Sequence, residues 1–149
     1  MEERYYDLTA AQRILFFAQK HSLHKELNNI SVSVLVDAEF DLDTLEQAIK
    51  KAYVRNDALR IRVVKVGKEI KQYFADYEEP EIKFLDFRRK TQEQMEKKLR
   101  RIARKPICIV GTSMSKVYIL RASDGRWGIF FVVSHLMMDF WAIAVFFKD

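Results

Sequence analysis

The sequence predicts an α+β domain in which helices pack on a mixed, largely antiparallel sheet. Segments with an apolar residue at every third or fourth position, which is the helical period, alternate with short runs of β-branched and aromatic residues, which favour strands. Two pairs of predicted strands are joined by short turns that contain Gly67 or Gly125, and hairpins of this kind produce antiparallel neighbours.

Length and composition indicate one globular domain spanning residues 1–149. The chain is 49% hydrophobic and contains eleven Phe, six Tyr and two Trp, which is sufficient for a core. No run has the length of a membrane span, and the first residues are unlike a signal peptide. The single cysteine, Cys108, excludes an internal disulfide and favours a cytoplasmic location. Because it lies between Ile107 and Ile109, we expect a buried thiol.

The first third of the chain predicts two helices separated by a strand. Thr9 and Gln12 have the spacing of a capping box, and helical periodicity continues to His21. We expect its buried stripe to be Ala11, Ile14, Leu15 and Ala18. Residues 30–36 alternate as a strand with one buried face, and residues 43–55 form the next helix.

The middle of the chain predicts a hairpin, a short strand and a third helix. Residues 61–66 and 70–74 flank Gly67, and residues 81–86 form a further short strand. A second capping box at residues 91–94 begins a helix. We expect its inward positions to be Met95, Leu99 and Ile102.

The last third predicts a hairpin and a closing helix. Residues 115–122 and 127–133 are two strands joined by an Asp-Gly turn, and the second is apolar on both faces, so we expect it to be central in the sheet. Residues 139–149 are apolar almost throughout and predict a buried helix. Core packing is the expected role of four further residues, Phe16, Met137, Met138 and Trp141.

A histidine and a carboxylate follow the central strand. His135 comes directly after the apolar run, and Asp139 follows four residues later. An imidazole there can accept and return a proton near neutral pH. The alternative is a strand-end histidine satisfied by backbone, and Asp139 is also placed to cap the last helix. His21 and His24 lie in a polar stretch at a helix end, where we expect them to be solvated.

The net charge of +5 is concentrated in one segment. The outward positions of the third helix and the residues after it carry Lys97, Lys98, Arg100, Arg101, Arg104 and Lys105. A solvated helix face explains such a cluster, and a docking surface for an acidic partner is the sharper alternative. Nucleic acid is not the expected partner, because no aromatic residues interleave with these charges.

Residues 8–16 resemble the pattern S-x-A-Q-x-R-L-W, and residues 55–63 resemble R-H-E-x-L-R-T-x-F. Residues 134–140 resemble H-H-x-x-x-D-G and keep His135 and Asp139. Together the three segments resemble motifs of the condensation domains of nonribosomal peptide synthetases, which belong to the chloramphenicol acetyltransferase-like acyltransferase superfamily. The motifs have the order and separation of the family, so the resemblance covers nearly the whole chain.

The resemblance implies a chloramphenicol acetyltransferase-like α/β sandwich, of which residues 1–149 cover only the N-terminal lobe. The family's active site lies in a tunnel between two lobes, so we expect a second lobe or a homo-oligomer to complete it, and the isolated lobe to be inactive alone. The implied activity transfers a carrier-bound acyl or aminoacyl thioester to an amine or hydroxyl. The tether would be the carrier's phosphopantetheine arm, with no cofactor or metal bound directly.

The resemblance also implies separate roles for the motif residues. His135 would be the catalytic base or positioning group, and Asp139 would support the site by pairing with an arginine, for which Arg60 is the preferred partner. The sequence departs from the family at Ser134, which replaces a histidine, and at Phe140, which replaces a glycine.

The implied partner is an acyl or peptidyl carrier protein, which would dock on the basic helix through Lys97, Lys98, Arg100, Arg101 and Arg104. A second function class stays open, in which a catalytically inactive or fragmentary lobe acts as an interaction or dimerisation module. The apolar last helix favours this alternative, because a large exposed apolar face marks an interface.

Overall fold

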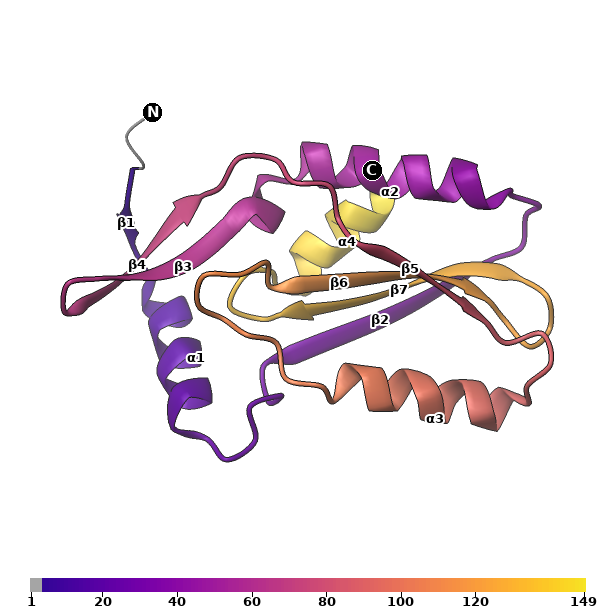
Figure 1. The fold of residues 1–149 in the computed structure, drawn as a ribbon, viewed down its shortest axis with the longest axis horizontal. Coiled ribbons are helices and arrows are strands. Elements are labelled where there is room, and N and C mark those ends of the chain that lie inside the picture. Colours follow the sequence, from indigo (N-terminus) through magenta and orange to yellow (C-terminus); the bar gives the residue numbers. More distant parts are fainter. Residues whose placement is uncertain (1–3) are drawn as a thin grey trace.

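The computed structural model describes residues 4–149 as helices packed on two separate sheets (Figure 1). The larger sheet has the strand order β2-β7-β6-β5. Its strands are β2 (Asn29–Val36), β7 (Trp127–Ser134), β6 (Ser115–Arg121) and β5 (Ile82–Asp86). β5 runs parallel to β6 and the other pairs are antiparallel, so the sheet is mixed, as predicted.

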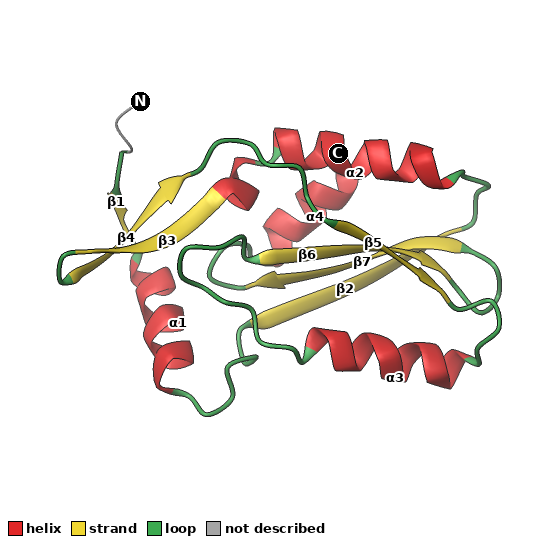
Figure 2. Ribbon diagram, in the orientation of Figure 1, coloured by secondary structure: helices red, strands yellow, loops and turns green. Residues whose placement is uncertain are grey.

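The smaller sheet is an antiparallel hairpin with one added short strand (Figure 2). It contains β1 (Tyr6–Asp7), β4 (Glu69–Phe74) and β3 (Ile61–Val66). Gly67 turns this hairpin with φ 59°, and Gly125 turns the β6–β7 hairpin with φ 87°, backbone angles that glycine adopts without a steric cost. Both predicted hairpins are therefore confirmed.

Four helices and one short 3-10 helix lie within the described residues 4–149. They are α1 (Ala10–His21), α2 (Leu42–Arg55), the 3-10 helix Asp57–Arg60, α3 (Gln92–Ala103) and α4 (Phe140–Lys148). Both predicted capping boxes are present, Thr9 with Gln12 and Thr91 with Gln94. The cap of α2 is Asp41, whose side chain accepts from the Thr44 amide, so that helix begins slightly earlier than predicted.

The core is centred on β7, which lies between β2 and β6 and is buried along most of its length. α2 and α4 lie on one side of the larger sheet and α3 on the other (Figure 1). The Phe131 ring stacks on Phe146 of α4 with centroids 4.7 Å apart, and Tyr118 lies 5.8 Å from Phe130 on the adjacent strand. The prediction of a central, doubly covered strand is confirmed.

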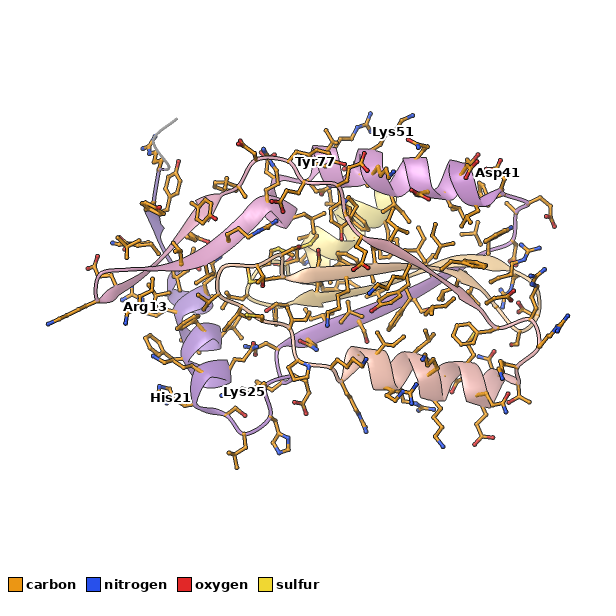
Figure 3. The ribbon with its side chains drawn as sticks, viewed as in Figure 1. Arg13, His21, Lys25, Asp41, Lys51 and Tyr77 are labelled. Carbon is orange, nitrogen blue, oxygen red and sulfur yellow. The ribbon has the colours of Figure 1, made fainter. Side chains whose placement is uncertain are left out.

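α1 presents a different face to the core from the one predicted. Of the expected stripe, Leu15 packs against the core, but Ala11, Ile14 and Ala18 are exposed, Ile14 by 70%. Phe16 and Gln19 are buried instead. The helix turns this way because the large Phe16 ring gains more from burial than the alanines of the expected stripe, and the Gln19 amide donates to the Ile107 carbonyl at 3.1 Å. His21 lies exposed at the end of the helix, as predicted, close to Lys25 in sequence (Figure 3).

Three further predictions of burial are wrong. Cys108 is exposed, because Ile107 and Ile109 turn inward on either side of it. α4 buries only one of its faces, through Ile143 and Phe146. Trp141 is 77% exposed, so its expected core role is wrong, while Phe16, Met137 and Met138 are core residues as expected.

None of the helices within residues 4–149 has the length and apolar character needed to cross a membrane.

Candidate active site

His135 lies immediately beyond the last residue of the central strand β7. Its backbone amide donates to the Asn28 carbonyl at 2.7 Å, which ties it to the residue preceding β2. Its side chain is exposed, and within residues 4–149 neither ring nitrogen has a hydrogen-bond partner. The backbone is therefore fixed while the imidazole is free to meet another molecule.

The residues on either side of His135 form a tight, buried turn. The Ser134 carbonyl accepts from the amides of Met137 at 2.9 Å and Met138 at 3.3 Å, and the Ser134 hydroxyl accepts from the Leu136 amide at 3.3 Å. Ser134, Leu136, Met137 and Met138 are all buried. Within residues 134–138, His135 alone is exposed, so the buried turn holds the backbone while the imidazole faces solvent.

Asp139 immediately precedes α4 and caps it, which confirms the capping role. Its carboxylate accepts from the Ala142 amide at 2.8 Å. The expected ion pair between Asp139 and Arg60 is not formed, because Arg60 pairs instead with Asp57, three residues earlier in the same 3-10 helix. A capping carboxylate is held by backbone amides and needs no cation to fix it. Asp139 thus sets the direction in which the chain leaves the turn.

Phe140 is accommodated without strain in place of the family's glycine. It is the first residue of α4, its ring is 69% exposed, and no residue other than glycine has a positive φ within the described range. The neighbouring Ser134 is completely buried and hydrogen-bonded, so it occupies its position without leaving a polar group unpaired.

Gln12 and Asn28 support the turn from outside, and sequence reasoning gave neither of them that role. The Gln12 amide of α1 donates to the Leu136 carbonyl at 3.2 Å and to the Gln72 side chain at 2.9 Å. The buried Asn28 amide donates to the Leu15 carbonyl at 2.8 Å and to the Gln19 side chain at 3.2 Å. The opening motif thus contacts the His135 turn directly through Gln12. Because Gln12 matches the glutamine of the family pattern, the sequence contained a signal that this residue has a specific role.

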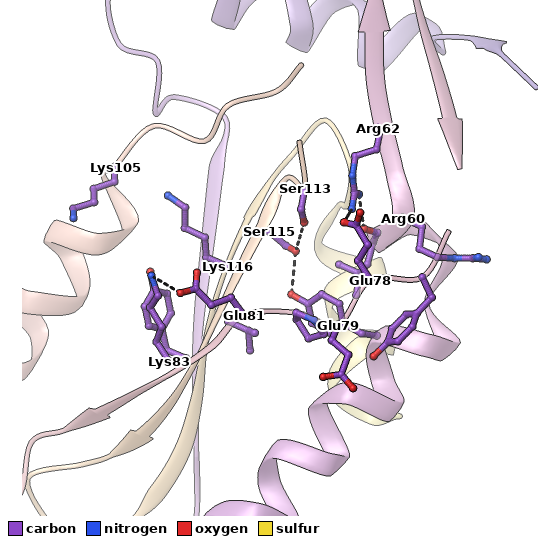
Figure 4. Close-up of a pocket in the computed structure, with 16 residues that line it drawn as sticks. Arg60, Arg62, Glu78, Glu79, Glu81, Lys83, Lys105, Ser113, Ser115 and Lys116 are labelled. Atoms are coloured by element: carbon purple, nitrogen blue, oxygen red, sulfur yellow. Dashed lines mark hydrogen bonds and ion pairs between the residues drawn. The ribbon is translucent and has the colours of Figure 1, made fainter. Parts of the chain in front are cut away.

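Arg60 lies apart from His135, at the lining of a cavity of about 410 Å³ (Figure 4). His135 and Asp139 do not line this cavity. One backbone hydrogen bond links the two regions: the Ser134 amide donates to the Met114 carbonyl at 2.9 Å, and both neighbours of Met114 line the cavity. Of the three predicted site residues, the structure brings His135 and Asp139 to one turn and leaves Arg60 elsewhere.

The exposed imidazole gives this turn its chemical capacity. A neutral imidazole can accept a proton from an attacking amine or hydroxyl and return it to a leaving group. Nothing in the turn supplies a nucleophile of its own, because the neighbouring serine hydroxyl is buried and accepts a backbone hydrogen bond. The arrangement therefore suits proton transfer between two substrates rather than a covalent enzyme intermediate.

Comparison with known proteins agrees with the motif resemblance. The family model of the condensation domain matches residues 2–149. A plipastatin synthase chain from Bacillus subtilis (strain 168) is 26% identical over 141 residues, which are 93% of this chain and 6% of that protein. A surfactin synthase chain from the same organism is 35% identical over 89 residues, or 58% of this chain and 2% of that protein.

Solved structures show the same fold. The starter condensation domain of rhizomide synthetase has a TM-score of 0.88 at 18% identity, covering 97% of this chain and 36% of that one. A four-domain nonribosomal peptide synthetase bound to AMP and glycine has a TM-score of 0.81 at 21% identity, covering 100% of this chain and 12% of that one. The chain therefore spans a small part of the relatives it matches.

The predicted fold class is confirmed by these structures, and the family match extends over almost every residue. The turn that carries His135 and Asp139, the cap that Asp139 provides and the contact from Gln12 are all formed within the matched region. The chain belongs to the condensation-domain family.

Proposed function

We propose that this chain is the histidine-bearing lobe of a condensation domain that joins a carrier-bound acyl or aminoacyl thioester to an amine or hydroxyl acceptor. The observation that carries the proposal is the exposed imidazole of His135 on a turn otherwise buried and anchored by Asn28 and Gln12. A side chain that must contact a mobile substrate benefits when its backbone is held in one position.

In the proposed step, the acceptor nitrogen or oxygen attacks the thioester carbonyl and forms the new C–N or C–O bond. His135 takes the proton that the acceptor loses, or orients the acceptor for attack. The C–S bond then breaks, and the thiolate of the carrier arm leaves with a proton returned by the imidazolium. The acyl group arrives already activated as a thioester, so the lobe does not need its own nucleophile.

The donor would be presented on the phosphopantetheine arm of a carrier protein. The outer face of α3 offers the docking surface for that carrier: Lys97, Arg100, Arg101 and Arg104 are exposed, and Lys98 is half-buried beside them. Only Arg100 of this group forms an ion pair within the described residues, with Glu96 at 3.2 Å. The remaining charges are available to an acidic partner.

The test is amide formation by the condensation domain that contains this lobe, with loaded carrier and amine acceptor. His135→Ala should remove most turnover, while His24→Ala, which changes another exposed histidine, should leave it unchanged. Full turnover by His135→Ala would refute the catalytic assignment. Unfolding curves of the two variants should coincide, because neither ring contributes to the core.

A second function is favoured by the exposed face of α4. Phe140, Trp141 and Val145 are 69%, 77% and 52% exposed and lie within two turns of one helix. An apolar surface of this kind is usually covered by a protein partner. In this alternative the lobe acts as an interaction module, and the surface is buried in a dimer whether or not His135 is active.

A further inference from the structure

A cavity of about 410 Å³ lies beside the open start of β6 (Figure 4). β5 begins to pair with β6 only at Val117, so Ser115 and Lys116 have no strand neighbour on that side. The segment between β4 and β5 lines the cavity, and so do Tyr53 of α2 and Lys105 beyond α3. Residues far apart in the sequence therefore converge on one hollow.

Cations outnumber carboxylates around this cavity. Five cationic side chains line it, Arg60, Arg62, Lys83, Lys105 and Lys116, against three carboxylates, Glu78, Glu79 and Glu81. Every one of the three carboxylates already has a cation: Glu78 pairs with Arg62 at 3.4 Å, Glu79 with Lys50 at 3.2 Å and Glu81 with Lys83 at 3.2 Å. The excess positive charge therefore has no acidic side chain left to neutralise it.

Lys105 and Lys116 carry that excess. Neither forms an ion pair with any described residue. The two side chains extend toward the same side of the cavity as Lys83 (Figure 4). Burial lowers the pKa of Lys116, and repulsion from Lys105 and Lys83 lowers it further, as expected for a partly buried ammonium group that has no counter-ion of its own.

A row of hydroxyl groups also lines this cavity. Tyr53 and Ser115 share a hydrogen bond of 3.0 Å, and Ser115 and Ser113 share one of 3.4 Å. Three hydroxyl protons serve only two hydrogen bonds in this row, so one O–H donor is left for a ligand. Arg62, only 7% exposed and bonded to the Leu59 and Ile61 carbonyls, forms a fixed wall on the opposite side.

We propose that this cavity binds the phosphate group of a small phosphorylated molecule. Separate ammonium groups and hydroxyl donors lining one cavity suit a tetrahedral dianion with several oxygens, whereas a planar carboxylate is better matched by the fork of a free arginine. The cavity is larger than a phosphate and within the usual size of ligand pockets, about 300–1,000 Å³. Tyr77, Pro80 and Tyr118 provide apolar surface for an attached organic body.

The test uses phenyl phosphate, inorganic phosphate and benzoate as probes, with binding followed by calorimetry and by amide NMR shifts of residues 113–118. Phenyl phosphate should bind saturably and more tightly than phosphate, and benzoate should bind weakest. Lys105→Met combined with Lys116→Met should weaken phenyl phosphate binding about tenfold, the usual scale for losing charge-assisted hydrogen bonds.

The matched control is Lys65→Met with Lys68→Met, which removes the same charge from exposed residues at the β3–β4 turn. This pair should leave the affinity unchanged, and an equal loss in both double variants would show nonspecific attraction and overturn the site. Equal binding of benzoate would overturn the phosphate assignment. His135→Ala should not alter binding, so this result is independent of the catalytic proposal. Thermal unfolding of each variant separates loss of binding from loss of fold.

Discussion

The side-chain amide of Gln12 donates a hydrogen bond of 3.2 Å to the Leu136 carbonyl, across 124 positions of sequence. The same glutamine caps its own helix, because its oxygen accepts from the Thr9 amide at 2.9 Å. One side chain therefore starts α1 and fastens it to the turn that carries His135.

Gln12→Ala should reduce the free energy of unfolding by about 2 kcal/mol, because it removes the cap interaction and the part-buried hydrogen bonds to the Leu136 carbonyl and the Gln72 side chain. Gln94→Ala is the matched control, because Gln94 has the same capping-box position in α3 and no contact with the turn. It should cost about 1 kcal/mol. Chemical denaturation measures both, and equal losses would contradict the tether between α1 and the turn.

Asp139→Ala should lower the free energy of unfolding by about 1 kcal/mol, because α4 loses its cap. Asp41→Ala, which removes the corresponding cap from α2, should cost a similar amount. Asp139→Asn should retain most of the stability, since an amide oxygen can also accept from the Ala142 amide. Chemical denaturation of the three variants is the measurement, and an unchanged midpoint for Asp139→Ala would contradict the cap.

Arg60 should be energetically independent of Asp139. In a double-mutant cycle with Arg60→Ala and Asp139→Ala, the two effects should add to within about 0.5 kcal/mol, because Arg60 pairs with Asp57. A coupling energy above about 1 kcal/mol would contradict this independence and support the direct Arg60–Asp139 ion pair that the family resemblance suggested.

The local elements could be predicted because their signals are local. Capping boxes depend on residues three apart, and hairpins on a glycine between two alternating runs. The orientation of α1 could not be predicted this way, because burial of Gln19 depends on the Ile107 carbonyl, 88 positions away. For the same reason, periodicity could not identify Asn28 as the residue that holds the backbone of His135.

The site was predicted at the level of the motif and not at the level of its contacts. The sequence placed His135 directly after the central strand, where the structure has it, and gave Asp139 two candidate roles. The structure shows the helix-capping role. Arg60 was chosen from the second motif, where a nearer acid, Asp57, takes its guanidinium. An ion pair between residues three apart costs little conformational entropy, because few residues must be ordered to form it. A sequence motif does not include this entropy cost, so it cannot rank the two possible partners of Arg60.

Reversing four charges on α3 should weaken binding of a holo carrier protein. Lys97, Lys98, Arg100 and Arg101 changed to Glu would oppose an acidic partner, and the effect should shrink as salt is added. The control reverses four cations on other elements, Lys51, Arg55, Lys65 and Lys68, with the same change in net charge. Titration by fluorescence anisotropy compares carrier binding by the two variants. Unchanged affinity in the α3 variant would refute the proposal that the carrier docks on α3.

Trp141→Glu should convert a dimer into a monomer. The indole is 77% exposed on the apolar face of α4, and a charge there would oppose burial against a second copy. Val66→Glu, at the remote tip of β3, should not change the mass. Light scattering at micromolar concentration is the measurement, and a monomer before any substitution would count against the interaction module.

The strand order β2-β7-β6-β5 has a consequence during synthesis of the chain. β2 is completed early, yet its partner in the sheet is β7, whose residues emerge about 90 positions later. Until then β2 has two unsatisfied edges and an apolar face, which is the state most prone to aggregate. A nascent chain that stalls before Trp127 would therefore contain β2 without its partner strand. Binding of chaperones should be strongest between the synthesis of β2 and that of β7.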